Sequence, residues 1–330
     1  MNCLVTGGGG FLGLAIVKQL LAKNHSVRTY QRNLYPALTA LNVEQIQADL
    51  SDVSALTAAT KNIDLLFHVA AKPGVWGSYA DFHTPNVVGT QNVLAACRSA
   101  GVPRLIFTSS PSVVFNGRDE NQITESAPYP KRYLAHYPKT KAIAEQLVLA
   151  ANSPNLSTIA LRPHLIWGPG DPHLVPRILA RARSGRLSMI GKRNNLVDST
   201  YIDNAAHAHL LAAQHLAPSA PCAGKAYFIS NGEPLPMAEL IRRILAAAQL
   251  ATVMPSINPH LAYAAGTAME LTHKLFRLKH EPLLTRFVAR QLSTAHWFDL
   301  TAARRDLNYQ PLITIDEGMR RLTQSLRDPA

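Results

Sequence analysis

Cysteine, charge and long uninterrupted apolar runs are all scarce in this chain of 330 residues. Its three cysteines, Cys3, Cys97 and Cys222, lie far apart and form no Cys-x-x-Cys pair. That usage is typical of a reducing compartment, and it argues against a disulfide framework or a thiolate metal site. Charged residues make up 16% of the chain and hydrophobic residues 47%, a balance that excludes disorder, collagen and coiled coil.

Signals for membrane insertion or export are also lacking. The first residues have neither a basic region nor a signal-peptide core, so a cytoplasmic location is expected. Residues 244–269 carry no charge, but prolines and polar side chains interrupt them; a spanning helix is not expected, and peripheral membrane contact is the most we expect. The thirteen histidines show no ligand spacing with cysteines or carboxylates, so no metal site is predicted.

Short β-branched runs alternate with longer amphipathic segments through the first two thirds of the chain, which predicts an α/β protein with a parallel sheet covered on both faces. Strands are predicted over Asn2–Thr6, Ser26–Tyr30, Glu44–Gln47, Asp64–His68, Arg104–Thr108, Ser157–Leu161 and Ala226–Ile229. Helices are predicted over Phe11–Lys23, Val53–Thr60, Val87–Ala100 and Tyr137–Ala151.

After Leu161 the alternation gives way to loops, helices and prolines. This predicts a smaller, mainly helical C-terminal cap on the carboxyl edge of the sheet. The expected division assigns residues 1–162, with a returning strand near 226–229, to a cofactor-binding domain. Residues 163–225 and 230–330 would form the substrate-binding cap.

A glycine-rich turn joins the first predicted strand to the first predicted helix. Gly7, Gly10 and Gly13 are spaced to allow a tight turn, close approach of the backbone to a pyrophosphate, and close helix packing. Together with Phe11 and Leu12 they predict a dinucleotide-binding site and a Rossmann-type doubly wound sheet. A purely structural glycine turn is the alternative.

The end of the second predicted strand bears on cofactor choice. Enzymes that use NAD usually carry an acid there for the ribose 2′-hydroxyl, but this chain has Arg32 within Tyr-Gln-Arg-Asn, and Glu44 is the nearest acid. A planar guanidinium can pair with a 2′-phosphate. We therefore predict NADP(H) rather than NAD(H), with a solvated surface arginine as the alternative.

One tyrosine in the chain is followed four residues later by lysine. On a helix, Tyr137 and Lys141 share a face, so the ammonium group could lower the pKa of the phenol and reach a ribose. That pairing predicts a general acid or base, because a phenol at its ordinary pKa is a poor one at neutral pH. A surface pair on an amphipathic helix is the alternative.

The order of these elements resembles the extended short-chain dehydrogenase/reductase family: a Gly-x-x-Gly-x-x-Gly turn, then Ser110 after the fifth predicted strand, then Tyr-x-x-x-Lys. The resemblance implies carbonyl reduction. Ser110 would hydrogen-bond the substrate carbonyl, Tyr137 would donate the proton, and Lys141 would hold the ribose. It also implies further cofactor contacts, namely Asp49, Leu50, Ala70, Ala71, Lys72, Thr108, Pro163 and His164.

Longer stretches narrow the resemblance. Residues 225–234 and 303–311 resemble the 3β-hydroxysteroid and sterol-carboxylate dehydrogenase branch, and residues 71–79, 165–171 and 195–204 resemble bacterial 2-alkyl-3-oxoalkanoate reductases of long-chain olefin biosynthesis. The second group implies NADPH-dependent reduction of a 2-alkyl-3-oxo acid to the 2-alkyl-3-hydroxy acid. The chain departs from that group at Ser110, where threonine is usual, although either hydroxyl can donate a hydrogen bond.

Other functions stay open at this point. A 3β-hydroxysteroid or sterol-type dehydrogenase acting on a hydrophobic alcohol or ketone would use the same three side chains. A non-catalytic NADP-sensing regulator is expected to have a broken Tyr-x-x-x-Lys, which is intact here. Val197 stands where nucleotide-sugar relatives carry arginine, so a sugar nucleotide is disfavoured.

The substrate and partner predictions rest largely on apolar side chains. Trp76, Tyr79, Ser112 and Trp167 are the predicted substrate contacts. The apolar face of Leu261–Leu278 would either cover the substrate or pack on the core of the cap. The resemblance also implies a possible homodimer through residues 87–100 and 137–151, and association with other enzymes of the olefin pathway.

Basic residues outnumber acidic ones by 33 to 21, and half of the resulting net charge of +12 lies in residues 162–193. Stacking aromatics and groove-reading motifs are absent from 177–193, so nucleic-acid binding is not expected. We expect at least one of Arg177, Arg181, Arg183 and Arg186 to attract a carboxylate substrate or the phosphates of the cofactor. Solubility or partner contact is the alternative.

Overall fold

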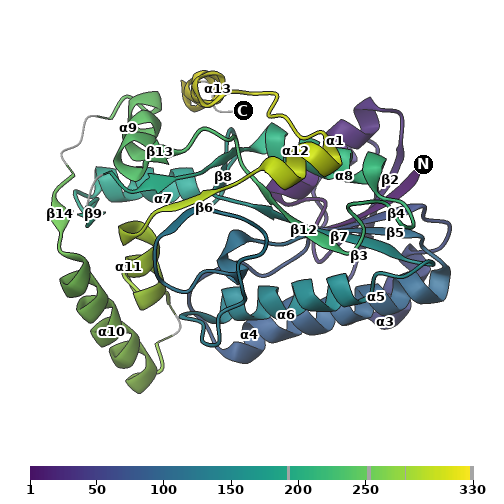
Figure 1. The fold of residues 1–330 in the computed structure, drawn as a ribbon, viewed down its shortest axis with the longest axis horizontal. Coiled ribbons are helices and arrows are strands. Elements are labelled where there is room, and N and C mark those ends of the chain that lie inside the picture. The colour runs from purple at the N-terminus through teal and green to yellow at the C-terminus, as the bar shows by residue number, and fades with distance from the viewer. Residues whose placement is uncertain (192–193, 251–253, 279, 328–330) are drawn as a thin grey trace.

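Seven parallel strands form the main sheet of the molecule, in the spatial order β12-β7-β5-β4-β1-β2-β3 (Figure 1). The computed structural model describes residues 1–191, 194–250, 254–278 and 280–327. The strands are β1 Asn2–Thr6, β2 Ser26–Gln31, β3 Glu44–Gln47, β4 Leu65–His68, β5 Arg104–Thr108, β7 Ser157–Pro163 and β12 Lys225–Ile229. Every strand predicted for this sheet is present within two residues of its expected bounds.

Helices cover both faces of the sheet, as the buried strands β4, β5 and β7 require. Figure 1 shows α1 (Phe11–Ala22) and α8 (Ile202–His215) on one face, with α3 (Val53–Ala59), α5 (Gly89–Ala100) and α6 (His136–Ala150) on the other. Each face has its own hydrophobic core. The predicted doubly wound Rossmann-type fold is confirmed.

The direction of chain progression across the sheet reverses between β1 and β4. From β1 the chain proceeds to β2 and β3 on one side, and β4, β5, β7 and β12 follow on the other. Ligands of such sheets bind beyond the carboxyl ends of the strands at this switch point. The loops that follow β1 and β4 therefore meet where a dinucleotide is expected.

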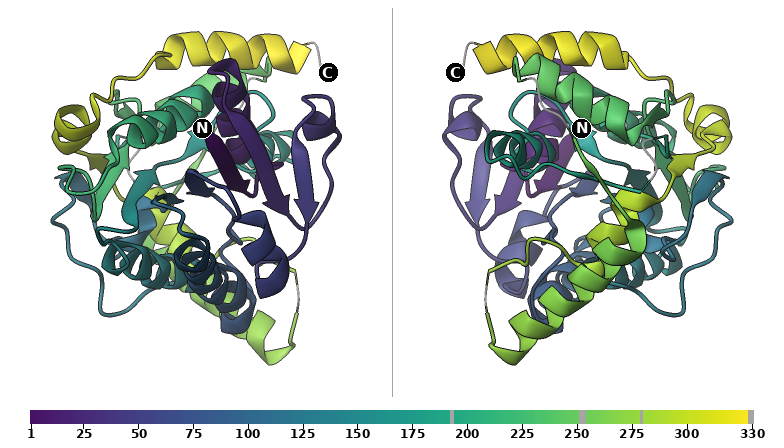
Figure 2. Two further views of the ribbon diagram at one scale, coloured as in Figure 1. Left: turned by 90° about the vertical axis from the view of Figure 1, so that its right-hand side faces the viewer. Right: turned by 90° about the vertical axis from the view of Figure 1, so that its left-hand side faces the viewer.

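Most of the remaining elements are short strands and helices at the carboxyl edge, whereas α12 (Thr301–Leu307) packs on β12 and α8. A four-stranded sheet has the order β13-β10-β15-β6, and two further strand pairs are β11-β8 and β14-β9. Figure 2 shows α13 and α10 on opposite sides of the molecule. The strands are β6 Glu120–Ile123, β8 Ile166–Trp167, β9 Met189–Ile190, β10 Leu196–Val197, β11 Thr200–Tyr201, β13 Leu235–Pro236, β14 Ser256–Ile257 and β15 His296–Phe298; the helices are α7 Leu174–Arg183, α9 Met237–Ala247, α10 Pro259–Leu275, α11 Arg286–Ser293, α12 Thr301–Leu307 and α13 Ile315–Arg327.

Two elements belong to one predicted domain by their place in the sequence but pack against the other domain. β6 lies within residues 1–162 but pairs in parallel with β15 of the C-terminal part. Conversely, α8 lies within 163–225 but packs on α1, β5 and β7. Small buried residues of α8, such as Ala205 and Ala206, allow this close packing on the main sheet. The division of the chain otherwise stays a prediction.

Several short elements were not predicted. They include α2 (Pro36–Thr39), α4 (Tyr79–His83) and the 3-10 helix η2 (Pro111–Val113). A single-turn π-helix, η1 (Thr84–Val88), leads directly into α5, and such turns are often found at functional sites.

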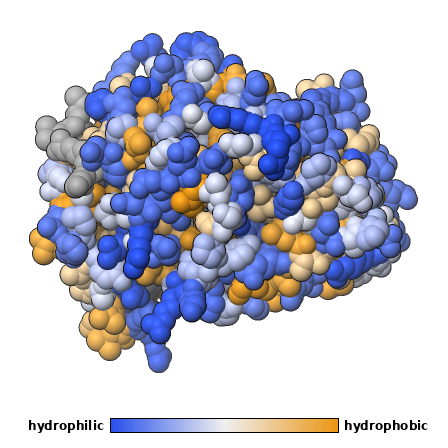
Figure 3. Space-filling model, viewed as in Figure 1, coloured by the Kyte–Doolittle hydropathy of each residue, from blue (hydrophilic) through white to orange (hydrophobic). Residues whose placement is uncertain are grey.

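The apolar face predicted on Leu261–Leu278 matches neither of its expected roles. Most of its large side chains point to solvent, with Leu271, Leu275 and Phe276 all more than 60% exposed. Ala262, Gly266 and Glu270 instead form the buried side of α10. Figure 3 shows apolar surface at the lower left, where Figure 1 places α10. None of the helices in the described ranges is both long and apolar enough to cross a membrane; of the uncharged stretch 244–269, residues 251–253 lie outside those ranges.

Candidate active site

The glycine turn closes against the loop after β4. Gly7 has a left-handed backbone (φ +71°), and a Cβ built on it would lie 3.0 Å from the Ala70 backbone. A Cβ on Gly13 would lie only 2.1 Å from the Gly7 carbonyl oxygen, so α1 can approach the turn this closely only with glycine there. Gly10 is the N-cap of α1, and the first turn of a helix presents N–H groups suited to an anion.

A cavity of about 540 Å³ extends from this turn along the carboxyl edge of the sheet. It brings together all the predicted cofactor residues except His164, and all three predicted catalytic residues. Its predicted lining residues are Gly7, Gly10, Phe11, Leu12, Gly13, Arg32, Asp49, Leu50, Ala70, Ala71, Lys72, Thr108, Ser110, Tyr137, Lys141 and Pro163. A cavity that begins at the glycine turn and at the first turn of α1 fits a bound dinucleotide.

Arg32 lies at the exposed edge of this cavity, where the second strand ends. Hydrogen bonds from Ser51 lower the pKa of the Asp49 carboxyl, and the nearby Arg32 guanidinium lowers it further. Asp49 therefore remains an anion at the part of the cavity that Arg32 lines. Gln31, rather than an acid, occupies the end of β2 beside Arg32.

A chain of hydrogen bonds fixes the loop after β4. The backbone N–H groups of Val69 and Ala70 donate to the Thr6 hydroxyl (3.2 Å each), which lies 2.8 Å from His68 Nδ1. On the other side of the ring, His68 Nε2 lies 3.0 Å from the Thr90 hydroxyl. The Thr6 oxygen already accepts these two bonds, so the Thr6 hydroxyl can donate its own proton to His68 Nδ1. The buried imidazole ring thereby holds the loop in place.

Asn86 connects the same loop to the helix that carries Tyr137. Its side-chain oxygen accepts from Lys72 N (2.7 Å), while its amide donates to Lys72 O and to the Thr140 hydroxyl. Sequence reasoning missed this buried residue. The only local signal was a proline followed by a polar residue ahead of a predicted helix, which does not reveal contacts with loop and helix together.

Tyr137 and Lys141 project from the first two turns of α6 into the cavity. The Lys141 ammonium donates to the Thr108 carbonyl (2.6 Å) and lies over the Phe107 ring. The Ser110 hydroxyl lies 2.9 Å from that of Ser112. The Tyr137 phenol, the Lys141 ammonium and the Ser110 hydroxyl thus line the same cavity as the glycine turn. We call it the cofactor cavity.

The pKa values differ from the expected pattern. Burial raises the pKa of Tyr137 to about 12, with the Ser110 side chain lowering it. Burial also lowers the pKa of Lys141 to about 7, against the attraction of Glu145. The expected lowering of the phenol pKa by Lys141 is not seen: burial and the Ser110 side chain are the causes of the shift, and the Lys141 ammonium donates to the Thr108 carbonyl.

None of the four predicted substrate residues lines this cavity. Trp167 is fully buried, donating to the Ser199 hydroxyl and packing on Tyr201. Trp76 packs on His273 and Tyr79 on His83 and His136. Ser112 contacts the site directly, through its bond to Ser110.

The arginines within residues 162–193 differ from one another in burial and in their ion-pair partners. Arg162 is buried against Glu145, and Arg177 pairs with Glu281. Arg183 and Arg186 are exposed, whereas Arg181 and Arg177 line a second, smaller cavity together with His164. Lys192 and Arg193 lie outside the described residues.

Residues 4–254 match the model of the 3-beta hydroxysteroid dehydrogenase/isomerase family. The chain belongs to this family. Within it, the chain is 52% identical to the 2-alkyl-3-oxoalkanoate reductase of Stenotrophomonas maltophilia (strain K279a), covering 98% of this chain and 99% of that protein. It is 36% identical to the human sterol-4-alpha-carboxylate 3-dehydrogenase, decarboxylating, over 99% of this chain and 88% of that protein.

Solved structures show the same fold. MoeE5 in complex with UDP-glucose and NAD superimposes with a TM-score of 0.77 at 25% identity, covering 99% of both chains. The structure of gox2253 gives a TM-score of 0.80 at 26% identity, covering 98% of this chain and 97% of that one. The expected relationship to the extended short-chain dehydrogenases/reductases is therefore confirmed.

Proposed function

We propose that this protein is an NADPH-dependent reductase that converts a 2-alkyl-3-oxoalkanoate to the 2-alkyl-3-hydroxyalkanoate. The observation that carries the proposal is the placement of Ser110, Tyr137 and Lys141 in the same cavity as the glycine turn. The substrate is taken from the relative named 2-alkyl-3-oxoalkanoate reductase, which is 52% identical.

When bound, NADPH supplies a hydride from its nicotinamide C4 to the ketone carbon. The protein residues provide the rest of the chemistry. The Tyr137 hydroxyl donates a proton to the ketone oxygen, and the Ser110 hydroxyl hydrogen-bonds that oxygen as negative charge develops on it. Lys141 is tied to β5 through the Thr108 carbonyl and would hold the ribose of the bound cofactor.

The preference for NADPH rests on Arg32. Its exposed guanidinium at the rim of the cavity can form two parallel hydrogen bonds with a 2′-phosphate, and no acid ends β2 to receive a ribose hydroxyl. The partners we propose are a hydrophobic β-keto acid as substrate, a second copy of the chain against α5 and α6, and other enzymes of olefin synthesis.

A dehydrogenase acting on a 3β-hydroxysteroid or sterol is the second candidate. It is favoured by the 36% identical sterol-4-alpha-carboxylate 3-dehydrogenase, and the same three side chains would perform the oxidation.

Oxidation of NADPH should be followed with a 2-alkyl-3-oxo acid and with a 3-ketosteroid, and each assay repeated with NADH. Turnover of the branched oxo acid with NADPH is the expected result. Turnover of the steroid alone would favour the second candidate, and no turnover of the oxo acid with either cofactor would overturn the first.

A further inference from the structure

A second cavity, of about 200 Å³, opens beside the cofactor cavity. Leu165 and Leu174 line both cavities, so the two cavities adjoin at these side chains. The walls are contributed by α7, α9 and α11 and by the segment around β9. Of the residues predicted from the sequence for the substrate, Arg177 and Arg181 line this cavity, whereas Trp76, Tyr79, Ser112 and Trp167 do not.

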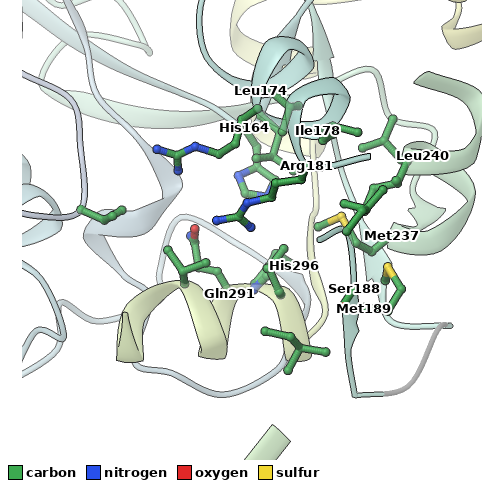
Figure 4. A pocket seen from close by; sticks show the side chains of 18 residues that line it. His164, Leu174, Ile178, Arg181, Ser188, Met189, Met237, Leu240, Gln291 and His296 are labelled. Carbon is green, nitrogen blue, oxygen red and sulfur yellow. The ribbon is translucent and has the colours of Figure 1, made fainter. Parts of the chain in front are cut away.

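This cavity has an apolar end and a polar end. Figure 4 shows Met189, Met237 and Leu240 on one side, and Arg181, His164 and Gln291 on the other. The volume exceeds that of a ~150 Å³ apolar protein cavity known to accommodate benzene. Such a cavity suits an amphipathic ligand with a hydrocarbon tail and a polar head.

The imidazoles at the polar end are uncharged. Burial lowers the pKa of His296 to about 4, and that of His164 well below its usual range. The Thr294 hydroxyl donates to the Arg290 carbonyl, so it accepts from His296 Nε2, and His296 Nδ1 presents a lone pair. His296 Nδ1 and His164 Nε2 have no hydrogen-bond partner among the described residues. The imidazoles therefore supply no positive charge to neutralise an anion at this end, and the charged groups that line the cavity are arginines.

Arg181 is the arginine available for that purpose. Its Nη2 donates to the Leu283 carbonyl (3.0 Å), and no carboxylate of the described ranges forms an ion pair with it. Arg177 also lines the cavity, but its guanidinium is paired with Glu281 at 2.9 Å. Arg183, two residues further along α7 than Arg181, is exposed and does not line the cavity.

We propose that the cavity holds an alkyl chain of the substrate and that Arg181, with Gln291 beside it, binds the substrate carboxylate. The inference rests on the proposed function and assigns the site that selects a branched acid. The acid is drawn to Arg181 at the polar end, while its hydrocarbon chain extends towards Leu240 and Met237.

A ligand that cannot be reduced separates this inference from the proposed reaction. Binding of a 2-alkylalkanoate without the 3-oxo group should be measured by calorimetry for the wild type, Arg181→Gln and Arg183→Gln. We expect Arg181→Gln to weaken binding at least about tenfold, because it removes a charge-assisted hydrogen bond. Arg183→Gln carries the same loss of charge and should bind as the wild type does.

The corresponding methyl ester tests whether Arg181 recognises the carboxylate. It should bind the wild type and Arg181→Gln equally. For the tail, Leu240→Trp should weaken binding of a long-chain 2-alkyl acid while leaving a short-chain acid unaffected, which also shows that the variant is folded. Equal affinity of the acid for wild type and Arg181→Gln, or an equal loss in Arg183→Gln, would overturn the inference. A wild type that binds the acid but never reduces its 3-oxo analogue would overturn only the proposed reaction.

Discussion

The Arg162 guanidinium forms two hydrogen bonds with the Glu145 carboxylate, of 2.9 Å and 2.6 Å, and both side chains are almost completely buried. Glu145 lies on α6 one turn after Lys141, and Arg162 lies on β7. The Tyr129 hydroxyl donates to the same carboxylate. The pair thus ties the helix that carries Tyr137 and Lys141 to the central sheet.

Breaking this pair from one side should be costly. Arg162→Met leaves the Glu145 carboxylate buried without its cation, and we expect the free energy of unfolding to fall by about 3–5 kcal/mol. Urea unfolding measures the change. The double variant Arg162→Met with Glu145→Gln should lose less than the sum of the two single variants, because no unpaired charge remains; additive losses would contradict a coupled pair.

Tyr137→Phe should reduce kcat by about 10²–10⁴-fold, because the proton donor is removed. The affinity for NADPH, measured by fluorescence titration, should stay close to that of the wild type. Ser110→Ala should also lower kcat, whereas Ser110→Thr keeps a hydroxyl and should retain most of the activity. A fully active Tyr137→Phe variant would rule out the proposed role of the phenol.

Gly13→Ala should abolish binding of the dinucleotide and destabilise the fold. The new Cβ would lie 2.1 Å from the Gly7 carbonyl oxygen, so the turn and the start of α1 would have to separate. Gly10→Ala is a matched control in the same turn, because its Cβ meets only the Gly7 oxygen at 3.3 Å. Cofactor titration and thermal unfolding should both rank Gly13→Ala as the more damaged variant; the reverse order would contradict this packing.

Arg32→Ala should raise the KM for NADPH at least about tenfold, because a charge-assisted contact with the 2′-phosphate is lost. The KM for NADH should change little. Arg28→Ala is the control: Arg28 lies on β2, four residues before Arg32, and pairs with Glu44 outside the cofactor cavity. If Arg32→Ala impaired both cofactors equally, the preference for NADPH would need another source.

The sequence predicted the main sheet well because its strands are short, apolar and bounded by turn residues, and this local pattern reflects burial under helices. The four-stranded sheet was missed for the opposite reason. β6 and β15 lie more than 170 residues apart and are only three or four residues long. Pairing of such short segments is decided by tertiary contacts that leave no periodicity in the chain.

At the site, the glycine turn and the Tyr-x-x-x-Lys pair were predictable, because the spacing of their residues along the chain determines how they lie in a turn or on one face of a helix. His164 was predicted to contact the cofactor; its ring packs against His296 and Phe298, and the residue lines the smaller cavity. Leu165, the next residue, has a positive φ of 41°. A positive φ is uncommon for residues other than glycine, so the sequence did not predict this backbone conformation. Arg181 likewise could not be distinguished from Arg177 and Arg183 in the sequence, because the burial and ion pairing of these arginines depend on the fold.

Lys141 should leave a pH signature in the stability of the protein. Its folded pKa of about 7 lies below the ordinary value of 10.5, so between these pH values the unfolded chain binds the additional proton. The contribution of Lys141 to the free energy of unfolding therefore rises with pH across this window, by at most ~1.4 kcal/mol per pH unit, and is constant below about pH 7. Lys141→Met removes it. Urea unfolding at pH 6.5, 8 and 9.5 (~1.5-unit steps) should show the wild type gaining stability relative to the variant as the pH rises. Parallel pH profiles for the two proteins would mean that the buried ammonium keeps its ordinary pKa.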